Sequence, residues 1–466
     1  MKQAEYQISL FDGDHKLTID KPIRLIELFA GYGSQALALK YLGANFEHWK
    51  ICEWAAKSIQ AYKDLHFGDD NTDYSAAKTQ DEVINYLYSK GISANYNEPM
   101  TIDQIKRLGE EKQRVIYNNL IATHNLVSVC NCHASDLEIS DTDKYTYIMT
   151  YSYPCQDCSS AGKRLGMEKG SGTRSSLLWE VERILDECNG KLPQILLMEN
   201  VPEVIGTNNS EHFSQWVAKL DSLGYKSKWE ILNAKDYGVP QNRARCFMVS
   251  WLGNYYYDFP KKVKLEKRIK DILETNVDEK YYLNDDTIER ISKWKSQQQP
   301  LDHILNDNSC SPCLTARGGG EEHSGMILYG EIKCNCVGML GGKYEKLHDI
   351  ARRVYDTNGI APTQHTCGGG NLETKILVVD EQNEYIRQDG IVGTLTTDGS
   401  SPKHNNRIIE NLHIRKLTPK ECGRLMGVRD KDIDTMAVNQ SNSSQYHLYG
   451  DSIVVDVLMA IFGQML

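Results

Sequence analysis

The chain has 466 residues, of which 40% are hydrophobic and 25% charged, a composition that suits two or three domains with buried cores. Its net charge of −10 argues against a protein that coats nucleic acid by bulk charge, although a local basic groove is still compatible with it. No apolar run approaches the length of a membrane span, and the polar residues 1–19 do not resemble a secretory signal. The thirteen cysteines are therefore expected to be reduced thiols.

The first hundred residues open with alternating strands and helices. Residues 23–30 have the pattern of a buried strand, and a Gly-Tyr-Gly-Ser turn then leads into a helix over 35–42. A second strand is predicted at 46–52 and a second helix at 55–65. This order predicts a βαβ unit at the start of an α/β fold.

The glycine turn at 31–34 is a candidate cofactor loop, because glycines let the backbone approach a ligand closely. It lacks the third glycine of a dinucleotide fingerprint and the Lys-Ser/Thr of a phosphate loop. Glu53 stands at the end of the next strand, where an acid can bind ribose hydroxyls, and Trp54 can stack on a purine. The combination favours an adenosyl cofactor without pyrophosphate, such as S-adenosylmethionine. A purely structural turn is the alternative for the glycines alone.

The middle of the chain begins with a charged, helical segment at 69–125 that is poor in apolar residues and is interpreted as an insertion. Its predicted helices span 81–90 and 102–124. Strand–helix alternation then resumes, which extends the α/β pattern. The predicted elements are 144–150, 175–188, 194–199 and 211–223, followed by β-rich segments at 226–233 and 245–252.

Cys155 follows Pro154 just after the strand predicted at 144–150. The proline fixes the backbone ahead of the thiol, at the edge of the sheet where open α/β folds bind ligands. Three interpretations compete: a redox pair with Cys158, half of a zinc site, or a nucleophile. The remaining cysteine pairs, 310/313 and 334/336, have a spacing unlike ordinary zinc ribbons.

Two further segments carry polar side chains that suit this edge. Glu199 ends the apolar strand at 194–199, so its carboxylate is expected to converge with Cys155; capping of the next helix is the alternative. Arg243 and Arg245 alternate along a strand, which puts two guanidinium groups on one face, suited to a carbonyl oxygen or a phosphate.

The sequence pattern changes at about residue 260, where short β-type runs alternate with Gly, Asn, Asp and Ser. Similar Thr- and Gly-containing loops at 312–320, 361–370 and 393–399 each precede an apolar run. They predict a small β-rich domain that presents loops, with simple hairpin turns as the alternative. The tail 452–466 is apolar enough to pack back onto the first domain.

Two basic stretches are candidate DNA contacts despite the acidic total. Residues 403–431 hold eight Lys/Arg against three acids, and residues 261–268 are also basic. Solvated helix faces are the alternative interpretation, more so for 261–268.

These segments together resemble the ordered motifs of the cytosine-5 DNA methyltransferases of bacterial and phage type. The resemblance covers most of 23–252 and 412–466. It implies an α/β fold: a doubly wound, Rossmann-like S-adenosylmethionine-dependent domain with a smaller β-rich target-recognition domain. The implied division is a catalytic domain at 1–258, target recognition at 259–411, and a C-terminal segment at 412–466 that returns to the first domain. The matching motifs are Phe-Ala-Gly at 29–31, Pro-Cys-Gln at 154–156, Glu-Asn-Val at 199–201, Gln-Asn-Arg-Ala-Arg at 241–245, 415–427 and Tyr-Gly-Asp-Ser at 449–452.

The resemblance implies methyl transfer from S-adenosylmethionine to carbon 5 of a cytosine flipped out of a specific double-stranded DNA sequence. Cys155 would attack carbon 6, which makes carbon 5 nucleophilic. Glu199 would hold the exocyclic amine and N3, and Arg245, with Arg243 nearby, would bind the O2 side or order the site. The implied cofactor residues are Phe29, Gly31, Gly33, Glu53, Trp54, Asp136, Leu177 and Ser452, and no metal is implied.

The chain departs from the family at two positions near these residues. Asp451 replaces the usual Asn, so that an ionised side chain only accepts hydrogen bonds where the amide also donates. Cys158 lies unusually close to the nucleophile and is open to oxidation. Neither departure changes Cys155, Glu199 or the arginines.

Two rival functions are a tRNA cytosine-5 methyltransferase and a catalytically silent DNA-binding relative. The large region at 260–410 argues against the tRNA branch, which is compact there, and the intact catalytic residues argue against a silent relative. The expected setting is a monomer in the cytoplasm of a bacterial or phage-infected cell. Its expected partner is double-stranded DNA, with a restriction endonuclease in the same system as a further candidate. The target sequence cannot be deduced from the chain.

Overall fold

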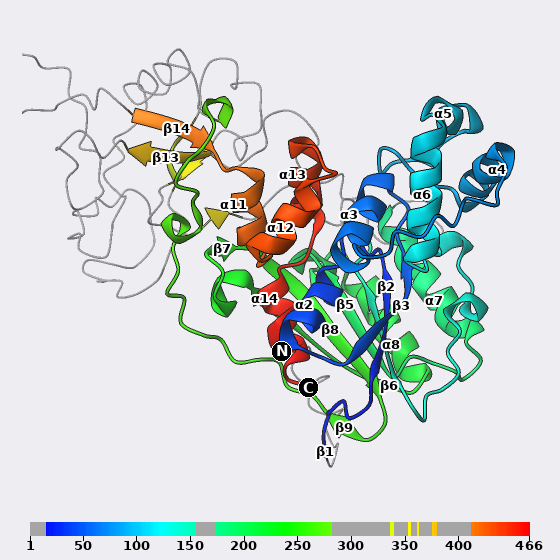
Figure 1. Ribbon diagram of the computed structural model, residues 1–466. Coiled ribbons are helices and arrows are strands. Elements are labelled where there is room, and N and C mark those ends of the chain that lie inside the picture. Colours follow the sequence, from blue (N-terminus) through cyan, green and yellow to red (C-terminus); the bar gives the residue numbers. More distant parts are fainter. Residues whose placement is uncertain are drawn as a thin grey trace, which may run out of the picture.

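The computed structural model describes residues 15–154, 174–281, 336–339, 353–355, 361–362, 375–379 and 412–466. Its main feature is a six-stranded sheet with the order β3-β2-β4-β5-β8-β6 (Figure 1). The strands are β2 (Ile23–Leu28), β3 (Phe46–Cys52), β4 (Thr146–Tyr151), β5 (Ile195–Asn200), β6 (Tyr225–Asn233) and β8 (Ala244–Leu252).

The sheet is mixed, and its order creates a point where ligands bind in such folds. Strands β3, β2, β4 and β5 are parallel, whereas β8 runs antiparallel to both of its neighbours. The chain passes from β2 to β3 on one side and later enters β4 on the other side of β2. The loops after β2 and β4 therefore diverge at the carboxyl edge, the place where ligands bind in such sheets.

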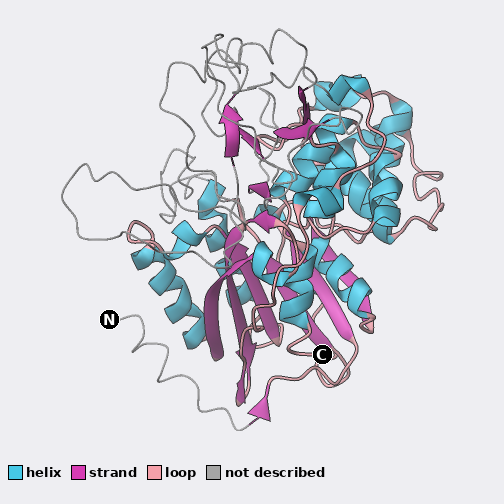
Figure 2. Ribbon diagram, turned by 90° about the vertical axis from the view of Figure 1, so that its left-hand side faces the viewer, coloured by secondary structure: helices cyan, strands magenta, loops and turns pink. Residues whose placement is uncertain are grey.

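Helices cover both faces of the sheet because its strand residues alternate between two apolar clusters (Figures 1 and 2). Leu25 and Ile148 face the cluster that α2 (Ser34–Leu42) and α14 (Val455–Phe462) cover. Ile26 and Met149 face the cluster under α7 (Leu178–Glu187) and α8 (Ser210–Ser222). The C-terminal helix thus packs on the first helix of the sheet, which confirms the prediction for the tail.

The insertion at 69–125 forms a helical unit beside α3 (Ala56–His66), at the upper right of Figure 1. It contains α4 (Gln80–Lys90), α5 (Ile102–Arg107) and α6 (Glu110–Ala122). The predicted helix at 102–124 is interrupted by Gly109, whose φ of 81° a non-glycine side chain rarely adopts. The expectation of an apolar-poor segment was wrong, because Val83, Leu87 and Leu120 belong to a buried apolar cluster that also includes Ile59 of α3.

The C-terminal part adds α11 (Pro419–Leu425), α12 (Asp430–Ala437) and α13 (Asn442–Asp451). A second, small sheet has the order β10-β11-β13-β14, and its strands are β10 (Cys336–Met339), β11 (Arg353–Tyr355), β13 (Lys375–Val379) and β14 (Leu412–Lys416). Of the three apolar runs predicted to follow the similar loops, 376–379 lies in β13, and 326–328 and 408–409 lie outside the described residues. The sheet also takes in the start of the segment 412–466.

The remaining elements are short. Strand β1 (His15–Lys16) pairs with β9 (Tyr255–Tyr256), and β7 (Gln241–Asn242) pairs with β12 (Ala361–Pro362). The second pair brings the backbone of the region expected to recognise DNA beside the Gln-Asn-Arg-Ala-Arg segment. The 3₁₀ helices are η1 (Val129–Asn131), η2 (Ala134–Leu137), η3 (Arg174–Leu177), η4 (Pro202–Ile205), η5 (Ala234–Tyr237), η6 (Ile269–Ile272) and η7 (Glu279–Tyr281).

Candidate active site

The loop between β2 and α2 has an unusual backbone. Phe29, Gly31 and Gly33 all have positive φ, of 61°, 57° and 82°. Gly33 is required because a Cβ there would overlap the side chains of Tyr62 and His66. A Cβ on Gly31 would meet no atom within 4 Å, so the backbone of this loop faces open space. A strained turn that leaves such space suits a bound ligand.

Glu53, at the end of β3, turns its carboxylate toward this loop. One oxygen accepts a hydrogen bond from the backbone N–H of Gly31 at 2.9 Å, and the other accepts from Ala55 at 2.8 Å. Burial raises the pKa of Glu53 to about 7, and the nearby carboxylate of Asp451 adds to the increase. A carboxylate is an acceptor of hydrogen bonds, which is the chemistry that the hydroxyls of a ribose require.

The turn after α13 meets the same loop from the other end of the chain. Burial raises the pKa of the Tyr32 hydroxyl to about 12, while the nearby Ser452 and Arg243 lower it. The rings of Tyr32 and Tyr449 pack edge to face, with centroids 6.0 Å apart. Residues predicted from three separate motifs, at 31, 53 and 452, are therefore brought together around one loop.

The remaining predicted cofactor residues come from three other elements. Phe29 and Leu177, which caps the start of α7, both pack partly buried against the cluster under α7. Trp54 packs partly buried against the cluster of the inserted unit. Asp136 lies in η2, where its Oδ2 accepts a hydrogen bond from the backbone N–H of His133 at 2.9 Å.

The end of β5 carries an ion pair that is largely shielded from solvent. Arg245 Nε lies 3.2 Å from Glu199 Oε1, and their side chains are only 16% and 11% exposed. Burial raises the pKa of Glu199, whereas Arg245 and Arg243 lower it. The alternative of a helix cap is wrong, because Val201 occupies the N-cap of η4 and no side chain caps that helix.

Cys155 lies outside the described residues, and Pro154 is the last residue before them. The strand that leads to it is held by Asn200, whose Nδ2 donates to the carbonyl of Tyr153 at 3.1 Å. Asn200 is not among the site residues predicted from the sequence. Asn200 directly follows Glu199 at the end of β5, and β5 pairs in parallel with β4, the strand that precedes Cys155. That position is the signal from which its role could have been predicted.

Arg243 lies between β7 and β8, and its guanidinium reaches toward the end of α13. Nη2 donates to the carbonyls of Ser452 at 2.6 Å and Gly450 at 3.0 Å. Arg243 and Arg245 border one small cavity with Phe247, so the two arginines do share a face. Their contacts differ, because Arg245 pairs with Glu199 whereas Arg243 fixes the turn that carries Ser452.

A loop of the inserted unit also reaches this area. The Ser93 backbone N–H donates to the carbonyl of Trp54 at 2.7 Å. Beyond it, the ring of Tyr96 packs on that of His447 with centroids 4.0 Å apart, and His447 Nδ1 lies 3.1 Å from Asp451 Oδ2. Nothing in the pattern of the sequence linked residue 96 to residue 451, because the two are joined only by the fold.

The basic stretch at 403–431 is partly neutralised by its own domain. Lys420 Nζ lies 2.7 Å from Asp434, and Arg424 Nη2 lies 2.6 Å from Asp430. Arg429 stacks on the ring of Tyr41. These three cations thus have partners within the described residues, and residues 403–411 of the stretch lie outside them.

Two features are absent from the described part of the chain. That part has no group of three or more His, Cys, Asp or Glu placed to hold a metal ion. No helix within it is long and apolar enough to cross a membrane.

Comparison with known proteins gives a consistent result. The family model of the C-5 cytosine-specific DNA methylases matches residues 116–466. The type II methyltransferase M2.ScrFI of Lactococcus lactis subsp. cremoris is 30% identical over 95% of this chain and 99% of its own length. The orphan methyltransferase M.SssI of Spiroplasma monobiae is 36% identical over 64% of this chain and 80% of its own length.

Solved structures agree on the fold. The S. pombe Dnmt2 methyltransferase is similar with a TM-score of 0.51 at 15% identity, covering 95% of this chain and 97% of its own. The Entamoeba histolytica methyltransferase EhMeth gives 0.52 at 14%, covering 96% and 98%. Family match, relatives and fold together show that this chain belongs to the C-5 cytosine-specific DNA methylases and is a DNA cytosine-5 methyltransferase.

Proposed function

We propose that this enzyme transfers a methyl group from S-adenosylmethionine to carbon 5 of a flipped-out cytosine in one double-stranded DNA sequence. The site lies at the carboxyl edge of the sheet, and Cys155 is the nucleophile. The Glu199–Arg245 pair carries this proposal. It is buried at the end of β5, beside the strand that leads to Cys155. A carboxylate and a guanidinium placed together suit the amine, N3 and O2 of one cytosine.

Glu199 accounts for the protonation of the base. Because burial raises its pKa, the carboxyl can hold a proton for N3 while its other oxygen accepts from the exocyclic amine. Charge develops on N3 and O2 as the thiolate adds to carbon 6. A proton at Glu199 and the cation of Arg245 offset that charge.

Cys155 forms a bond to carbon 6 and thereby makes carbon 5 nucleophilic. The bound cofactor supplies a methyl group activated by its positive sulfur. Loss of the carbon 5 proton then expels the Cys155 thiolate and restores the aromatic ring. A base inside the duplex cannot reach this buried edge, so it must be flipped out.

The cofactor half is assigned to the residues around the glycine loop. Glu53 accepts from the ribose hydroxyls, and the rings of Phe29 and Trp54 flank the adenine. The open backbone at Gly31, the turn at Gly33 and Ser452 line the side of the methionine part. Asp136 and Leu177 complete the adenine end.

We assign residues 259–411 to target recognition, 1–258 to the catalytic domain and 412–466 to a segment that returns to it. The pairing of β12 with β7 supports a recognition region that lies beside the arginine segment of the site. The small sheet joins this region to the start of the last segment through β14. The enzyme is proposed to act as a monomer on double-stranded DNA in the cytoplasm, with a restriction endonuclease of the same system as its functional counterpart.

The test is a base-resolution bisulfite readout of plasmid DNA from cells that express the chain, with Cys155→Ser as control. Protected cytosines in one sequence context, absent from the control, are expected. Cellular tRNA is read in parallel. Methylated tRNA with unmodified plasmid DNA, or full DNA protection by Cys155→Ser, would overturn the proposal.

A further inference from the structure

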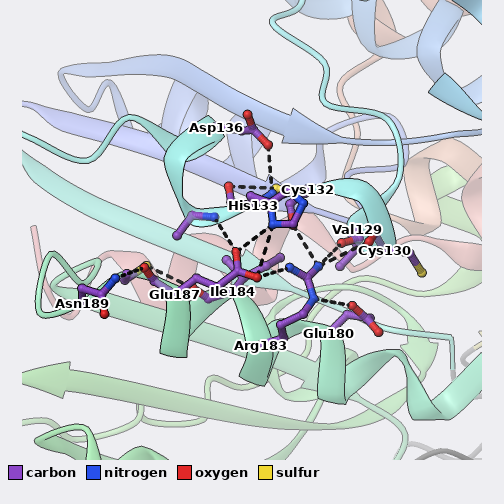
Figure 3. Close-up of polar contacts among 12 residues, drawn as sticks. Val129, Cys130, Cys132, His133, Asp136, Glu180, Arg183, Ile184, Glu187 and Asn189 are labelled. Atoms are coloured by element: carbon purple, nitrogen blue, oxygen red, sulfur yellow. Dashed lines mark hydrogen bonds and ion pairs between the residues drawn. The ribbon is translucent and has the colours of Figure 1, made fainter. Parts of the chain in front are cut away.

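Helix α7 holds the backbone of residues 129–134 through Arg183 (Figure 3). Its Nη2 donates to the carbonyls of Cys132 at 2.8 Å and Val129 at 3.1 Å. Its Nη1 and Nε donate to the carboxylates of Glu187 at 2.7 Å and Glu180 at 2.8 Å. The planar fork of the guanidinium therefore binds two acids of its own helix and a neighbouring loop at once.

Glu187 holds the same loop one step further along. Its Oε2 accepts from the backbone N–H of Ala134 at 3.1 Å and lies 3.1 Å from His133 Nδ1. The hydrogen bond from Arg183 is the main reason that the pKa of Glu187 is lowered to about 2. The carboxylate thus stays ionised and keeps both contacts at neutral pH.

The turn held in this way is the one that carries Asp136. Asp136 accepts from the backbone N–H of His133, the residue whose ring contacts Glu187. On the far side, Trp49 Nε1 donates to the carbonyl of Leu137 at 2.8 Å. A 3₁₀ helix of four residues has little stability of its own, so its geometry depends on these outside contacts.

We propose that Arg183 and Glu187 are positioning residues for the cofactor, which hold the Asp136 turn against α7 in the geometry that binds the adenine. The inference rests on the proposed function, in which Asp136 and Leu177 contact the cofactor. Leu177 caps the start of the same helix. The contacts of Arg183 and Glu187 with the turn, here called the clamp, therefore fix the distance between Asp136 and Leu177. The clamp has no part in the chemistry at the cytosine.

The experiment measures S-adenosylmethionine affinity by calorimetry on the full chain. Arg183→Gln is expected to weaken binding about 10-fold, the size of a coupling through a packed network. Glu187→Gln is expected to weaken it less, because the amide oxygen still accepts from Ala134. At saturating cofactor the turnover rate of both variants is expected to stay within about twofold of the wild type.

A double variant separates positioning from general stability. Asp136→Ala should weaken binding, and adding Arg183→Gln to it should change the affinity little further, because Arg183 acts through Asp136. The matched control is Asp186→Asn, which removes a 2.6 Å ion pair of the same helix that leads instead to Lys219 of α8. Its affinity should equal that of the wild type.

The outcomes distinguish the inference from the proposed function. If Asp136→Ala weakens binding and the Arg183 and Glu187 variants do not, the clamp is wrong while the function stands. Equal losses in Asp186→Asn, or full additivity in the double variant, would also overturn it. Unchanged binding in Asp136→Ala would contradict the proposed cofactor role. If Arg183→Gln does not fold, Glu187→Gln carries the test.

Discussion

Two buried carboxylates, Glu53 and Glu199, stand at the same edge of the sheet, on the cofactor half and on the base half. Burial raises the pKa of both. Glu53 is held by the backbone N–H groups of Gly31 and Ala55, whereas Glu199 pairs with the guanidinium of Arg245. Glu199 therefore has a cation of the protein beside it. The protonation of Glu53 instead depends on the bound ligand and on pH.

The difference fits the two tasks. A base that must be attacked requires charges fixed beforehand, since rearrangement during the reaction is costly. A ribose is neutral and its hydroxyls can donate, so carboxylate oxygens held by backbone N–H groups suffice. Breaking the cation at Glu199 should accordingly damage catalysis, whereas changes around Glu53 should alter binding and its pH dependence.

The largest effect is expected from Arg245→Ala, which leaves Glu199 buried without its paired cation. We expect kcat to fall by about 100- to 1000-fold, the usual loss for a group that stabilises charge in the transition state. The affinity for S-adenosylmethionine should stay within about twofold. Steady-state kinetics on methylatable DNA and calorimetry measure both. If the variant loses cofactor affinity and keeps its kcat, Arg245 belongs to the cofactor half and not to the base half.

Arg243→Ala should affect both halves, because Arg243 fixes the carbonyls of Gly450 and Ser452 while it also lowers the pKa of Glu199. We expect about 10-fold losses in both cofactor affinity and kcat, in line with lost charge-assisted hydrogen bonds. The same two measurements apply. A loss confined to kcat would show that the turn does not need this arginine.

Glu53 should make cofactor binding depend on pH. In the free protein its pKa is about 7, and ribose hydroxyls that donate to the carboxylate favour the ionised form. Binding then releases a proton below about pH 7, so affinity should rise from pH 5.5 to 7.5 and level off above. Calorimetry in buffers of different ionisation enthalpy detects the proton. Glu53→Gln should bind more weakly without that rise, and a pH-dependent Gln variant would exclude Glu53 as its source.

Glu27 should give the free protein a stability that falls as pH rises. It is fully buried, and its pKa is raised from 4.5 to about 7, so the folded state holds a proton that the unfolded state releases. The folded state is therefore favoured below pH 4.5 and loses about 3 kcal/mol of that advantage as pH rises to 7. The free energy of unfolding, measured with urea at several pH values, should fall less between pH 5 and 7 in Glu27→Gln than in the wild type. The same pH dependence in both proteins would contradict a pKa of Glu27 that burial raises.

The smallest effect is expected from Asp451→Asn, which restores the residue usual in the family. The carboxylate of Asp451 contributes to the raised pKa of Glu53. Its removal should lower that pKa and move the pH dependence of cofactor binding toward acid by a few tenths of a pH unit, because the group is half exposed and screened. An unchanged midpoint would show that the two carboxylates do not interact.

Much of this arrangement could be predicted from sequence, because the signals were local. Strands β2 and β5 have strong apolar patterns, and β3 ends in a buried Ile-Cys pair. Glu53 and Glu199 stand next to these buried residues in the chain. Parallel strands then bring such ends to one edge without further information.

What could not be predicted depended on contacts between distant segments. The different roles of Arg243 and Arg245 are decided by which partner each meets, and Ser452 lies 209 residues from Arg243. The buried cluster of the insertion was missed because its apolar residues are spread over several short helices with charged faces. Arg183 and Glu187, which form the clamp on the Asp136 turn, have the sequence pattern of an ordinary charged helix surface.

The measurement that tests the central claim most directly uses DNA in which the target cytosine carries fluorine at carbon 5. After methyl transfer there is no carbon 5 proton to lose, so the enzyme should remain bound to the DNA through Cys155. Mass spectrometry of the digested complex should find the methylated base on the peptide that contains Cys155, only with S-adenosylmethionine present, and never in Cys155→Ser. An adduct on another cysteine, or active enzyme that leaves the fluorinated base free, would contradict the account.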